Sequence, residues 1–354
     1  MRLPHPRGPL SAAVVTALAD DRPLDAPATT PLTPGSVLDV LTDGDQQLAL
    51  WVLYELSYRG FDGVGDDREW DTDLIGLRRS IEARFEEALR VATAPLLDGL
   101  DADLPVADVL LALPSAAGGP SPAAHLHRHA DVTVLRDFLR ERSVQQLKES
   151  DPQSFVLPRL AGPAKTALAE LQYDEFGGGR PERLHQQLYA DAMSAAGLDP
   201  AYGAYIDDIS AVSLAGANVM SLFALNRRLR GAAMGHLAFF EASSPVGSRK
   251  IAAGIERLGL PAAVSAYFHE HVEADSVHEQ VAAHDICGVL VEAEPELRDD
   301  VLLGAAACLH LDELSAVELM DRWTAQAPSP APTRTALPRP RVTADRDAAS
   351  LVTT

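Results

Sequence analysis

The sequence predicts an all-α fold. Its 354 residues are rich in Ala and Leu, only 5% of them are aromatic, and runs of β-branched residues are short. Ala and Leu have high helix propensity. Apolar residues also recur at helical spacing, as in the stripe that starts at Leu74 and ends at Leu89. A chain of this length can bury a substantial core, so we expect a helical bundle.

Composition divides the chain into four parts. Residues 1–36 carry many Pro and Thr residues without periodicity, and residues 325–354 are Pro-rich with little apolar sequence, so both are expected to be disordered. The segment AAGGPSP at 116–122 breaks the helical pattern. We expect it to separate an N-terminal helical extension, residues 37–115, from the main bundle, residues 131–324.

Helices are expected in the following order. The extension is expected to hold one helix over residues 37–59 and a second over the stripe from Leu74 to Leu89. In the bundle, periodicity and turn residues predict helices over these ranges: 132–150, 163–175, 181–197, 207–241, 247–258, 261–283, 287–294 and 296–323. Asp151-Pro152 is expected to end the first of these, and Pro245 lies just beyond the fourth.

Charge and cysteine content limit the partners. The formal net charge of −21 disfavours a nucleic acid, because phosphate backbones attract basic proteins. Cys287 and Cys308 lie in apolar helical sequence without CxxC spacing, so we expect buried thiols in a reducing, cytoplasmic compartment. No apolar run approaches the roughly 20 residues that cross a bilayer, and the first 20 residues lack the apolar core of a secretory signal. We expect no membrane partner.

The segment HVEADSVH at 271–278 is the strongest indication of function. At about 100° per residue, His271, Asp275 and His278 fall within roughly 60° of one another on a helix. Imidazole and carboxylate are ligands that first-row transition metals accept. The stripe therefore predicts one side of a metal site whose other ligands come from other helices.

A dinuclear iron site in a helical bundle needs inward-pointing carboxylates and histidines from several helices. Glu241 is a strong candidate because it follows LAFF at 237–240 in apolar sequence, where an unpaired charge would be costly. Glu149 closes VQQLKE at 144–149 and, from spacing alone, is an ordinary last-turn glutamate. Spacing thus favours Glu241 and leaves Glu149 undecided.

Two glutamates compete for a place near His185. Glu182 and His185 form the Glu-x-x-His pattern, in which both residues share a helix face. Glu175 lies ten residues before His185, and the glycines at 177–179 allow the chain to turn between them. The spacing does not choose between Glu175 and Glu182.

From about Val134 to Trp323 the sequence resembles the haem-oxygenase-like diiron oxidases, often described as iron-containing redox enzymes. The resemblance rests on five blocks in order along the chain: LKESDP at 147–152, PRLAGPAK at 158–165, QYDEFGGG at 172–179 followed by His185, GHLAFFE at 235–241, and HVEADSVH at 271–278. It is closest to the branch that N-oxygenates amines or guanidines.

The resemblance implies a haem-oxygenase-like helical bundle and a set of metal ligands, and it favours Glu175 over Glu182. Two Fe²⁺ ions would be held by four carboxylates and three imidazoles, which balances their charge. The implied ligands are Glu149, Glu175, His185, Glu241, His271, Asp275 and His278.

The resemblance also implies a non-haem dinuclear iron oxidase or oxygenase with O2 as co-substrate and a small molecule as substrate. N-oxygenation of an amine or guanidine is the expected reaction. Oxidative C–C cleavage or decarboxylation of a fatty or amino acid is the alternative, because one scaffold can support both. An external electron donor and a homodimer are compatible with this interpretation. A helical protein that binds iron, haem or another small ligand without catalysis is the alternative of a different class.

Several other titratable residues are expected to lie outside the site. The histidines at 125, 127 and 129 lack acidic or cysteine partners at metal-binding spacing and are expected in a solvated loop. His284-Asp285 lacks a second such pair, and His236 points away from Glu241. Glu55 lies in a helix of the extension, where we expect a docking role rather than iron binding.

Overall fold

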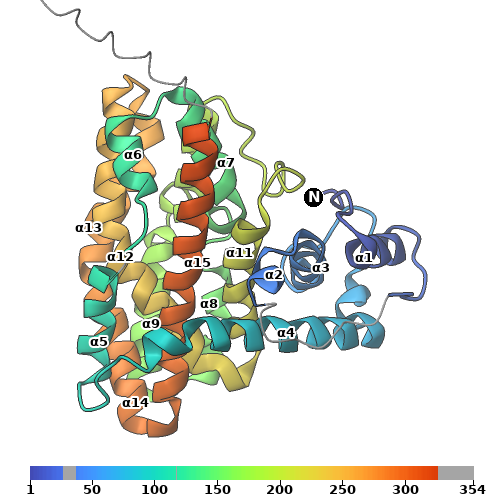
Figure 1. Ribbon diagram of the computed structural model, residues 1–354, viewed down its shortest axis with the longest axis horizontal. Coiled ribbons are helices and arrows are strands. Elements are labelled where there is room, and N and C mark those ends of the chain that lie inside the picture. The colour runs from blue at the N-terminus through green and yellow to red at the C-terminus, as the bar shows by residue number, and fades with distance from the viewer. Residues whose placement is uncertain (27–36, 117, 326–354) are drawn as a thin grey trace, which may run out of the picture.

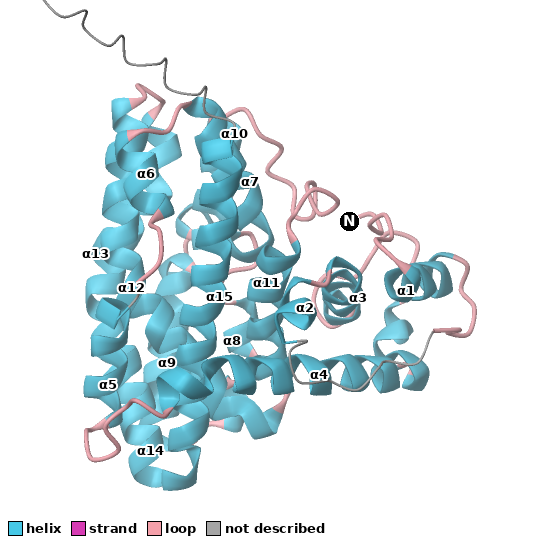
Figure 2. Cartoon of the chain, in the orientation of Figure 1, coloured by secondary structure: helices cyan, strands magenta, loops and turns pink. Residues whose placement is uncertain are grey.

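The computed structural model describes residues 1–26, 37–116 and 118–325. Within these ranges the chain forms helices and no strands, which confirms the all-α prediction (Figure 2). Figure 1 shows a tall bundle of roughly aligned helices with a smaller group of N-terminal helices on one side. Among the described residues, no helix combines the length and the apolarity that crossing a bilayer requires.

The bundle is built around α12, which packs mainly against α13 and α15. Its α-helices are α5 (Val106–Ala112), α6 (Pro122–Arg128), α7 (Val132–Gln146), α8 (Asp151–Ser154), α9 (Gly162–Glu175), α10 (His185–Ala195), α11 (Ala211–Leu225), α12 (Arg230–Arg257), α13 (Ala262–Gln280), α14 (Val289–Ala293) and α15 (Arg298–Ala325). A π-helix, η7 (Val281–Gly288), joins α13 to α14, and short 3₁₀ turns connect others: η2 (Leu113–Ala116), η3 (Leu157–Arg159), η4 (Gly177–Gly179), η5 (Pro181–Arg183), η6 (Arg227–Leu229) and η8 (Pro295–Leu297).

The N-terminal group contains α1 (Pro9–Ala19), α2 (Val37–Thr42), α3 (Gly44–Glu55), η1 (Asp66–Trp70) and α4 (Thr72–Leu97). In this group, α3 packs against α11, and α4 runs across the bundle to reach α15 (Figure 1). By contrast α5, which we expected in the extension, packs against η7 and α12. The division into an extension and a bundle stays a prediction.

The expectation of a disordered arm is wrong for residues 1–26. Helix α1 buries Leu10, Val14 and Leu18, which repeat every four residues along one face. The Asp45 carboxylate, at the start of α3, accepts the backbone N–H of Leu10 at 2.8 Å and that of Ser11 at 2.6 Å. The helix is thus capped by a residue far along the chain, which local composition does not reveal. Residues 27–36, and the expected disordered tail over residues 326–354, lie outside the described residues.

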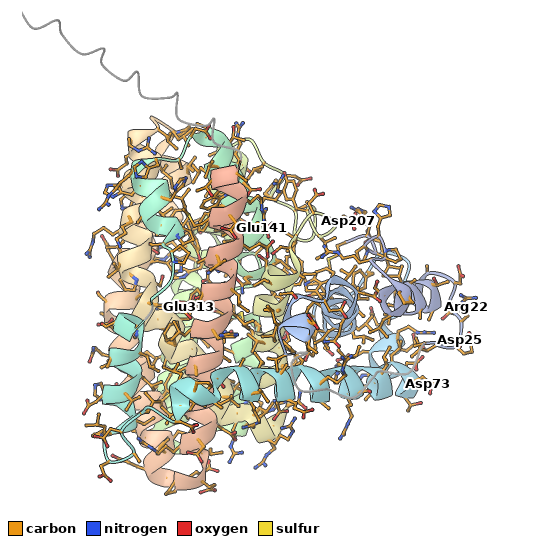
Figure 3. The ribbon with its side chains drawn as sticks, viewed as in Figure 1. Arg22, Asp25, Asp73, Glu141, Asp207 and Glu313 are labelled. Atoms are coloured by element: carbon orange, nitrogen blue, oxygen red, sulfur yellow. The ribbon has the colours of Figure 1, made fainter. Side chains whose placement is uncertain are left out.

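Contacts of the first residues with Asp207 also hold this segment in place. Asp207, labelled in Figure 3, accepts the His5 backbone N–H at 2.7 Å and a guanidinium N–H of Arg2 at 2.5 Å. Arg7 donates to the carbonyl oxygen of Ile209 at 2.7 Å. The N-terminal segment is therefore tied to the loop that precedes α11.

The helix expected over residues 132–150 is shorter than predicted. Helix α7 ends at Gln146, and residues 147–150 form turns that end with Ser150 in the left-handed region, at φ 67°. Asp151 and Pro152 then begin α8 instead of only ending α7. Proline is favourable in the first turn of a helix because its missing N–H has no intrahelical partner there.

The helix expected over residues 207–241 is two helices. Helix α11 ends where Asn226 becomes extended and its side-chain amide donates to the Leu222 carbonyl at 3.0 Å. Helix α12 then continues through Pro245, where we expected a break. Proline inside a helix removes one hydrogen bond, here the bond to the carbonyl of Glu241, and burial of α12 on both sides of Pro245 offsets that loss.

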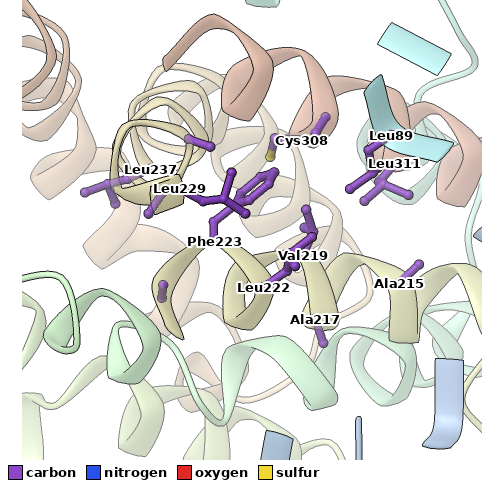
Figure 4. Close-up of a cluster of buried hydrophobic side chains, with 14 of the residues drawn as sticks. Leu89, Ala215, Ala217, Val219, Leu222, Phe223, Leu229, Leu237, Cys308 and Leu311 are labelled. Carbon is purple, nitrogen blue, oxygen red and sulfur yellow. The ribbon is translucent and has the colours of Figure 1, made fainter. Parts of the chain in front are cut away.

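Apolar side chains of α4, α11, α12 and α15 meet in the core that Figure 4 shows. Phe223 of α11 lies among Leu237 of α12 and Cys308 and Leu311 of α15, and each is at most 5% exposed. Cys308 and Cys287 are buried free thiols, as predicted, and burial raises the pKa of both.

Helices α12 and α15 approach each other at two glycines. A Cβ atom on Gly235 would lie 1.8 Å from the carbonyl oxygen of Val301, and a Cβ on Gly304 would lie 1.9 Å from that of Ala232. No side chain fits at such distances. The two glycines therefore bring α12, which carries Glu241, against α15.

Gly304→Ala is expected to destabilise the protein by about 1–3 kcal/mol, because the added methyl group overlaps a backbone carbonyl that moves only if the helices separate. Gly76→Ala in α4 is the control, since a Cβ there meets nothing within 4 Å. It is expected to gain up to about 1 kcal/mol of helix propensity. Urea unfolding measures both, and equal gains for both variants would contradict the close approach.

Candidate metal centre

The seven predicted ligands lie together inside the bundle, although they come from separate elements. Three belong to α13, one to α12, one each to the end of α9 and the start of α10, and one to the turn between α7 and α8. Each is at most 7% exposed. Their ligand atoms form two groups within which all lie within 4.8 Å of one another: Glu149, His185 and His271 in the first, and Glu175, Glu241, Asp275 and His278 in the second.

The α13 stripe faces inward as the periodicity predicts. His271, Asp275 and His278 are buried, whereas Val277 is 60% exposed on the other side of the helix. Helix α13 packs against α12 and α10, the elements that carry Glu241 and His185.

In the first group, Tyr267 holds both His271 and Glu149. The His271 Nδ1 lies 2.8 Å from the Tyr267 carbonyl oxygen, so Nδ1 carries the proton that this oxygen accepts. Nε2 is then the free ring nitrogen, and it lies 3.4 Å from Glu149 Oε1. The Tyr267 hydroxyl donates to the Glu149 carboxylate at 2.9 Å.

In the second group, His278 is oriented by Asp174. Its Nε2 lies 2.9 Å from Asp174 Oδ2, at the half-exposed edge of the site. Its Nδ1 therefore turns inward, where it lies 3.4 Å from Glu175, 3.5 Å from Glu241 and 3.8 Å from Asp275.

Glu175 joins the two groups. Its Oε2 lies 3.1 Å from Nδ1 of His185 in the first group, and its Oε1 lies 3.4 Å from Nδ1 of His278 in the second. The Ser150 hydroxyl, beside Glu149, donates to Oε2 at 2.9 Å. A carboxylate that faces both groups has the geometry of a ligand shared by two cations.

The pKa values of the buried acids shift in different directions: burial and repulsion raise them, and the neighbouring histidines lower them. Burial and the neighbouring Glu241 raise the pKa of Asp275 to about 9, and burial raises the pKa of Glu241 itself. For Glu175 burial acts in the same sense, but the charges and hydrogen bonds of His185 and His278 outweigh it and hold its pKa well below the usual value. In the second group, Glu175 is thus ionised next to Asp275, which retains its proton at neutral pH.

The three imidazoles respond to these carboxylates. Burial alone would lower their pKa values, yet Glu149 raises the pKa of His271 and Glu175 raises that of His185. Glu175 and Glu241 raise the pKa of His278 to about 11. Without metal, the protons on Asp275 and His278 therefore offset part of the negative charge of the site at neutral pH.

Several buried, inward-facing atoms lack a well-aligned hydrogen bond. They are both carboxylate oxygens of Asp275 and the Nδ1 atoms of His185 and His278, which lie 3.1 Å and 3.4 Å from Glu175. Buried polar atoms without partners are rare and costly in proteins. Oxygen and nitrogen donors that converge in this way fit divalent first-row metals, and four carboxylates match the charge of two such ions. The residues present therefore fit the two ions that the sequence predicts.

The other residues considered as metal ligands lie outside both groups. Glu182 is exposed on η5, and His284 and Asp285 are exposed on η7; none belongs to either group. His236 belongs to neither group, although it lines a small cavity together with Glu149, Glu175, Glu241 and His271, and burial lowers its pKa to about 4. The histidines at 125–129 were expected in a loop, but they belong to α6 and its C-cap, where His125 stacks on Trp323.

Three supporting residues were not predicted: Tyr267, Ser150 and Asp174. Tyr267 precedes His271 by four positions on the same helix face, so helical spacing offered a signal for it. Ser150 offered none, because its contact with Glu175 depends on a left-handed backbone that the sequence does not indicate. The sequence also did not indicate the π-helix η7, which begins three residues after His278. Turns of π-helix occur frequently at functional sites.

Glu55 docks the N-terminal group onto the site, within one chain. Its fully buried carboxylate accepts from Lys148 Nζ at 2.5 Å and from the Tyr202 hydroxyl at 2.8 Å. Lys148 precedes Glu149 and lies 4.2 Å from the centre of the Tyr58 ring. Arg59 donates to the Leu147 carbonyl at 2.9 Å. The turn that carries Glu149 is therefore held from the side of α3.

Two neighbouring cavities lie near the site, and the inner one touches four of its seven residues. The inner cavity, of about 30 Å³, touches Glu149, Glu175, Glu241 and His271 and has room for one or two water-sized molecules. The outer cavity, of about 450 Å³, lies between α7, α12, α13 and α15 and has several aromatic side chains in its wall. That volume suits a small organic molecule.

A helical bundle whose buried interior presents carboxylates and imidazoles in two adjoining groups belongs to the class of proteins that hold transition metals for redox chemistry. The family model described as iron-containing redox enzyme matches residues 136–313, a range that contains all seven residues, and this chain belongs to that haem-oxygenase-like family. The family supports an oxidoreductase. A comparison with curated proteins finds no match.

Metal binding is expected to strengthen as pH rises from 6.5 to 8.5. Asp275 and His278, with pKa values of about 9 and 11, hold protons in the metal-free fold. Metal ligands must be deprotonated, so binding releases these protons. In the metal-free protein both raised pKa values favour folding at low pH: the Asp275 contribution is lost between about pH 4 and 9, and that of His278 between about 6.5 and 11.

Thermal unfolding with and without Mn²⁺ at several pH values measures this effect. The stabilisation by metal is expected to grow by up to about 1.4 kcal/mol per pH unit for each proton released. Glu182→Gln, an exposed change outside both groups, should keep the same slope. A stabilisation that is constant or falls with pH would contradict the proton balance.

Lys148→Met is expected to lower stability by about 3–5 kcal/mol, because Glu55 is left charged and buried. The double variant Glu55→Gln/Lys148→Met should recover part of this loss, since it buries no charge. Lys165→Met, at an exposed position of α9, is the control. Urea unfolding measures all three, and a double variant no more stable than Lys148→Met would rule out the coupling.

Proposed function

We propose that this protein is an O2-dependent, non-haem dinuclear iron oxygenase that oxidises the nitrogen of a small-molecule amine or guanidine. The observation that carries the proposal is the sharing of Glu175 by two buried donor groups. Membership of the iron-containing redox family supports the metal and the redox chemistry. The choice of nitrogen rests on the resemblance of the five sequence blocks to the N-oxygenating branch.

The two donor groups would each hold one iron, with Glu175 between them. Glu149, His185 and His271 would bind one Fe²⁺. The second would be bound by three residues: Glu241, Asp275 and His278. When bound, such a pair of ions supplies the electrons and the coordination positions for O2 reduction.

The protein's own groups orient the ligands and keep water out. The Tyr267 carbonyl and the Asp174 carboxylate fix which ring nitrogen of His271 and of His278 faces inward. The Tyr267 hydroxyl and Ser150 hold the Glu149 and Glu175 carboxylates. Because the ligands are buried and the inner cavity is small, solvent competes little at the reacting position.

Oxygen insertion into an amine needs an external reductant. The balanced reaction is RNH₂ + O₂ + 2 e⁻ + 2 H⁺ → RNHOH + H₂O, so an electron donor must supply two electrons. Oxidative cleavage or decarboxylation of a fatty or amino acid is the alternative reaction at the same site. Product mass distinguishes the two, because N-oxygenation adds one oxygen atom and decarboxylation releases CO₂.

Anaerobic titration with Fe²⁺ tests the metal assignment. The wild-type protein is expected to bind two ions per chain. His185→Ala and Asp275→Asn each alter one donor group, so each is expected to retain about one ion, whereas Glu175→Gln alters the shared ligand and should lose both. Glu182→Gln is the control and should bind two. Equal binding by Glu175→Gln and the control would reject the shared site.

Exposure of the loaded protein to O2, followed by a transient visible absorbance and by O2 uptake, tests catalysis. The proposal expects rapid O2 consumption that Glu175→Gln abolishes. Two bound irons without O2 uptake would instead favour the alternative of an iron-binding protein without catalysis.

A further inference from the structure

A charged pair lies where the two cavities meet. The inner and outer cavities share four lining residues: Arg142, Gln146, Phe240 and Asp312. Arg142 projects from α7 and Asp312 from α15, and Arg142 Nη1 lies 3.3 Å from Asp312 Oδ1. Glu313, labelled in Figure 3, follows Asp312 and lines the outer cavity on the side of the segment that leads into α6. The pair thus separates the space that suits a substrate from the space that touches the metal ligands.

Most of the N–H donors of Arg142 are not used by its contact with Asp312. A guanidinium has five N–H donors, and a single contact of 3.3 Å to Asp312 occupies only one of those of Arg142 among the described residues. The side chains remain 21% and 41% exposed, respectively, although both line cavities. A bidentate pairing with a carboxylate would be the stronger interaction for Arg142.

A molecule that satisfies both residues must carry both charges close together. A carboxylate alone would neutralise Arg142 and leave Asp312 facing a negative neighbour, and an amine alone would leave Arg142 without a partner. Unpaired charges in a partly buried position are costly. An α-amino acid carries a carboxylate and an ammonium group on the same carbon atom, which matches an arginine and an aspartate in contact.

We propose that Arg142 and Asp312 bind the carboxylate and the amino group of an α-amino acid at the junction of the two cavities. This inference rests on the proposed function and names the substrate class. It makes the α-amino group the amine that faces the metal ligands.

The outer cavity then takes the side chain of the amino acid. Phe138, Phe239 and Phe268 line it together with Tyr189 and Leu319, so most of its wall is apolar. Its volume of about 450 Å³ accommodates a side chain as large as that of phenylalanine. An aromatic wall favours aromatic, aliphatic or thioether side chains.

Direct binding tests the proposal without iron or O2. The probes are L-phenylalanine, L-leucine, L-methionine, L-lysine and L-arginine, each with its analogue lacking the amino group and its analogue lacking the carboxylate. Calorimetry on the metal-free protein, and again with Mn²⁺ bound, gives the affinities. At least one amino acid is expected to bind at least about tenfold more tightly than both of its analogues, because each analogue leaves one charge unpaired.

Variants of the two residues test which of them binds the carboxylate and which binds the amino group. Arg142→Gln should remove the preference for the carboxylate, so that the amino acid and its decarboxylated analogue bind equally. Asp312→Asn should remove the preference for the amino group, and Arg142→Gln/Asp312→Asn should remove both without changing net charge. Arg128→Gln and Asp321→Asn are exposed controls with matched charge changes and should keep both preferences.

The outcomes separate this inference from the proposed function. Failure of all five amino acids to bind, or unchanged preferences in both Arg142→Gln and Asp312→Asn, would overturn it. Neither result depends on iron loading or O2 consumption. Conversely, tight amino-acid binding by a protein that does not consume O2 would keep the binding site and reject the oxygenase.

Discussion

Four carboxylates and three imidazoles buried in contact with one another need positive charge among them. Without metal, protons supply part of it, because burial and Glu241 raise the pKa of Asp275 to about 9, and Glu175 and Glu241 raise that of His278 to about 11. Protons, however, leave both oxygens of Asp275 without hydrogen-bond partners. Two divalent cations would satisfy those oxygens and the charge together. The helices of the bundle hold the seven side chains in positions where two divalent cations would neutralise their carboxylates.

Several packing contacts hold the helices and turns that carry these side chains. The close approach of α12 and α15 at Gly235 and Gly304 brings the helix that carries Glu241 into the core. On the opposite side, the Glu55–Lys148 pair holds the turn of Glu149 against α3. An element far from the ligands in sequence thus contributes to their geometry.

The sequence alone predicts those ligands whose signal lies within a single helix. The α13 stripe follows from helical spacing, and Glu241 follows from a charged residue within apolar sequence. Glu149 and Glu175 do not follow from spacing, because each lies at a helix end and reaches the site through a change of chain direction. The choice of Glu175 over Glu182 came from the resemblance, and the structure brings Glu175 into contact with His185 and leaves Glu182 exposed. Helix α1 was missed for a related reason, since its capping residue, Asp45, lies 34 positions beyond Ser11.

Anomalous diffraction from crystals loaded with Fe²⁺ under nitrogen tests whether two metal ions share the Glu175 carboxylate. We expect two iron peaks about 3.5–4 Å apart, with the Glu175 carboxylate in contact with both. A single peak, or two peaks of which only one contacts Glu175, would contradict the shared centre.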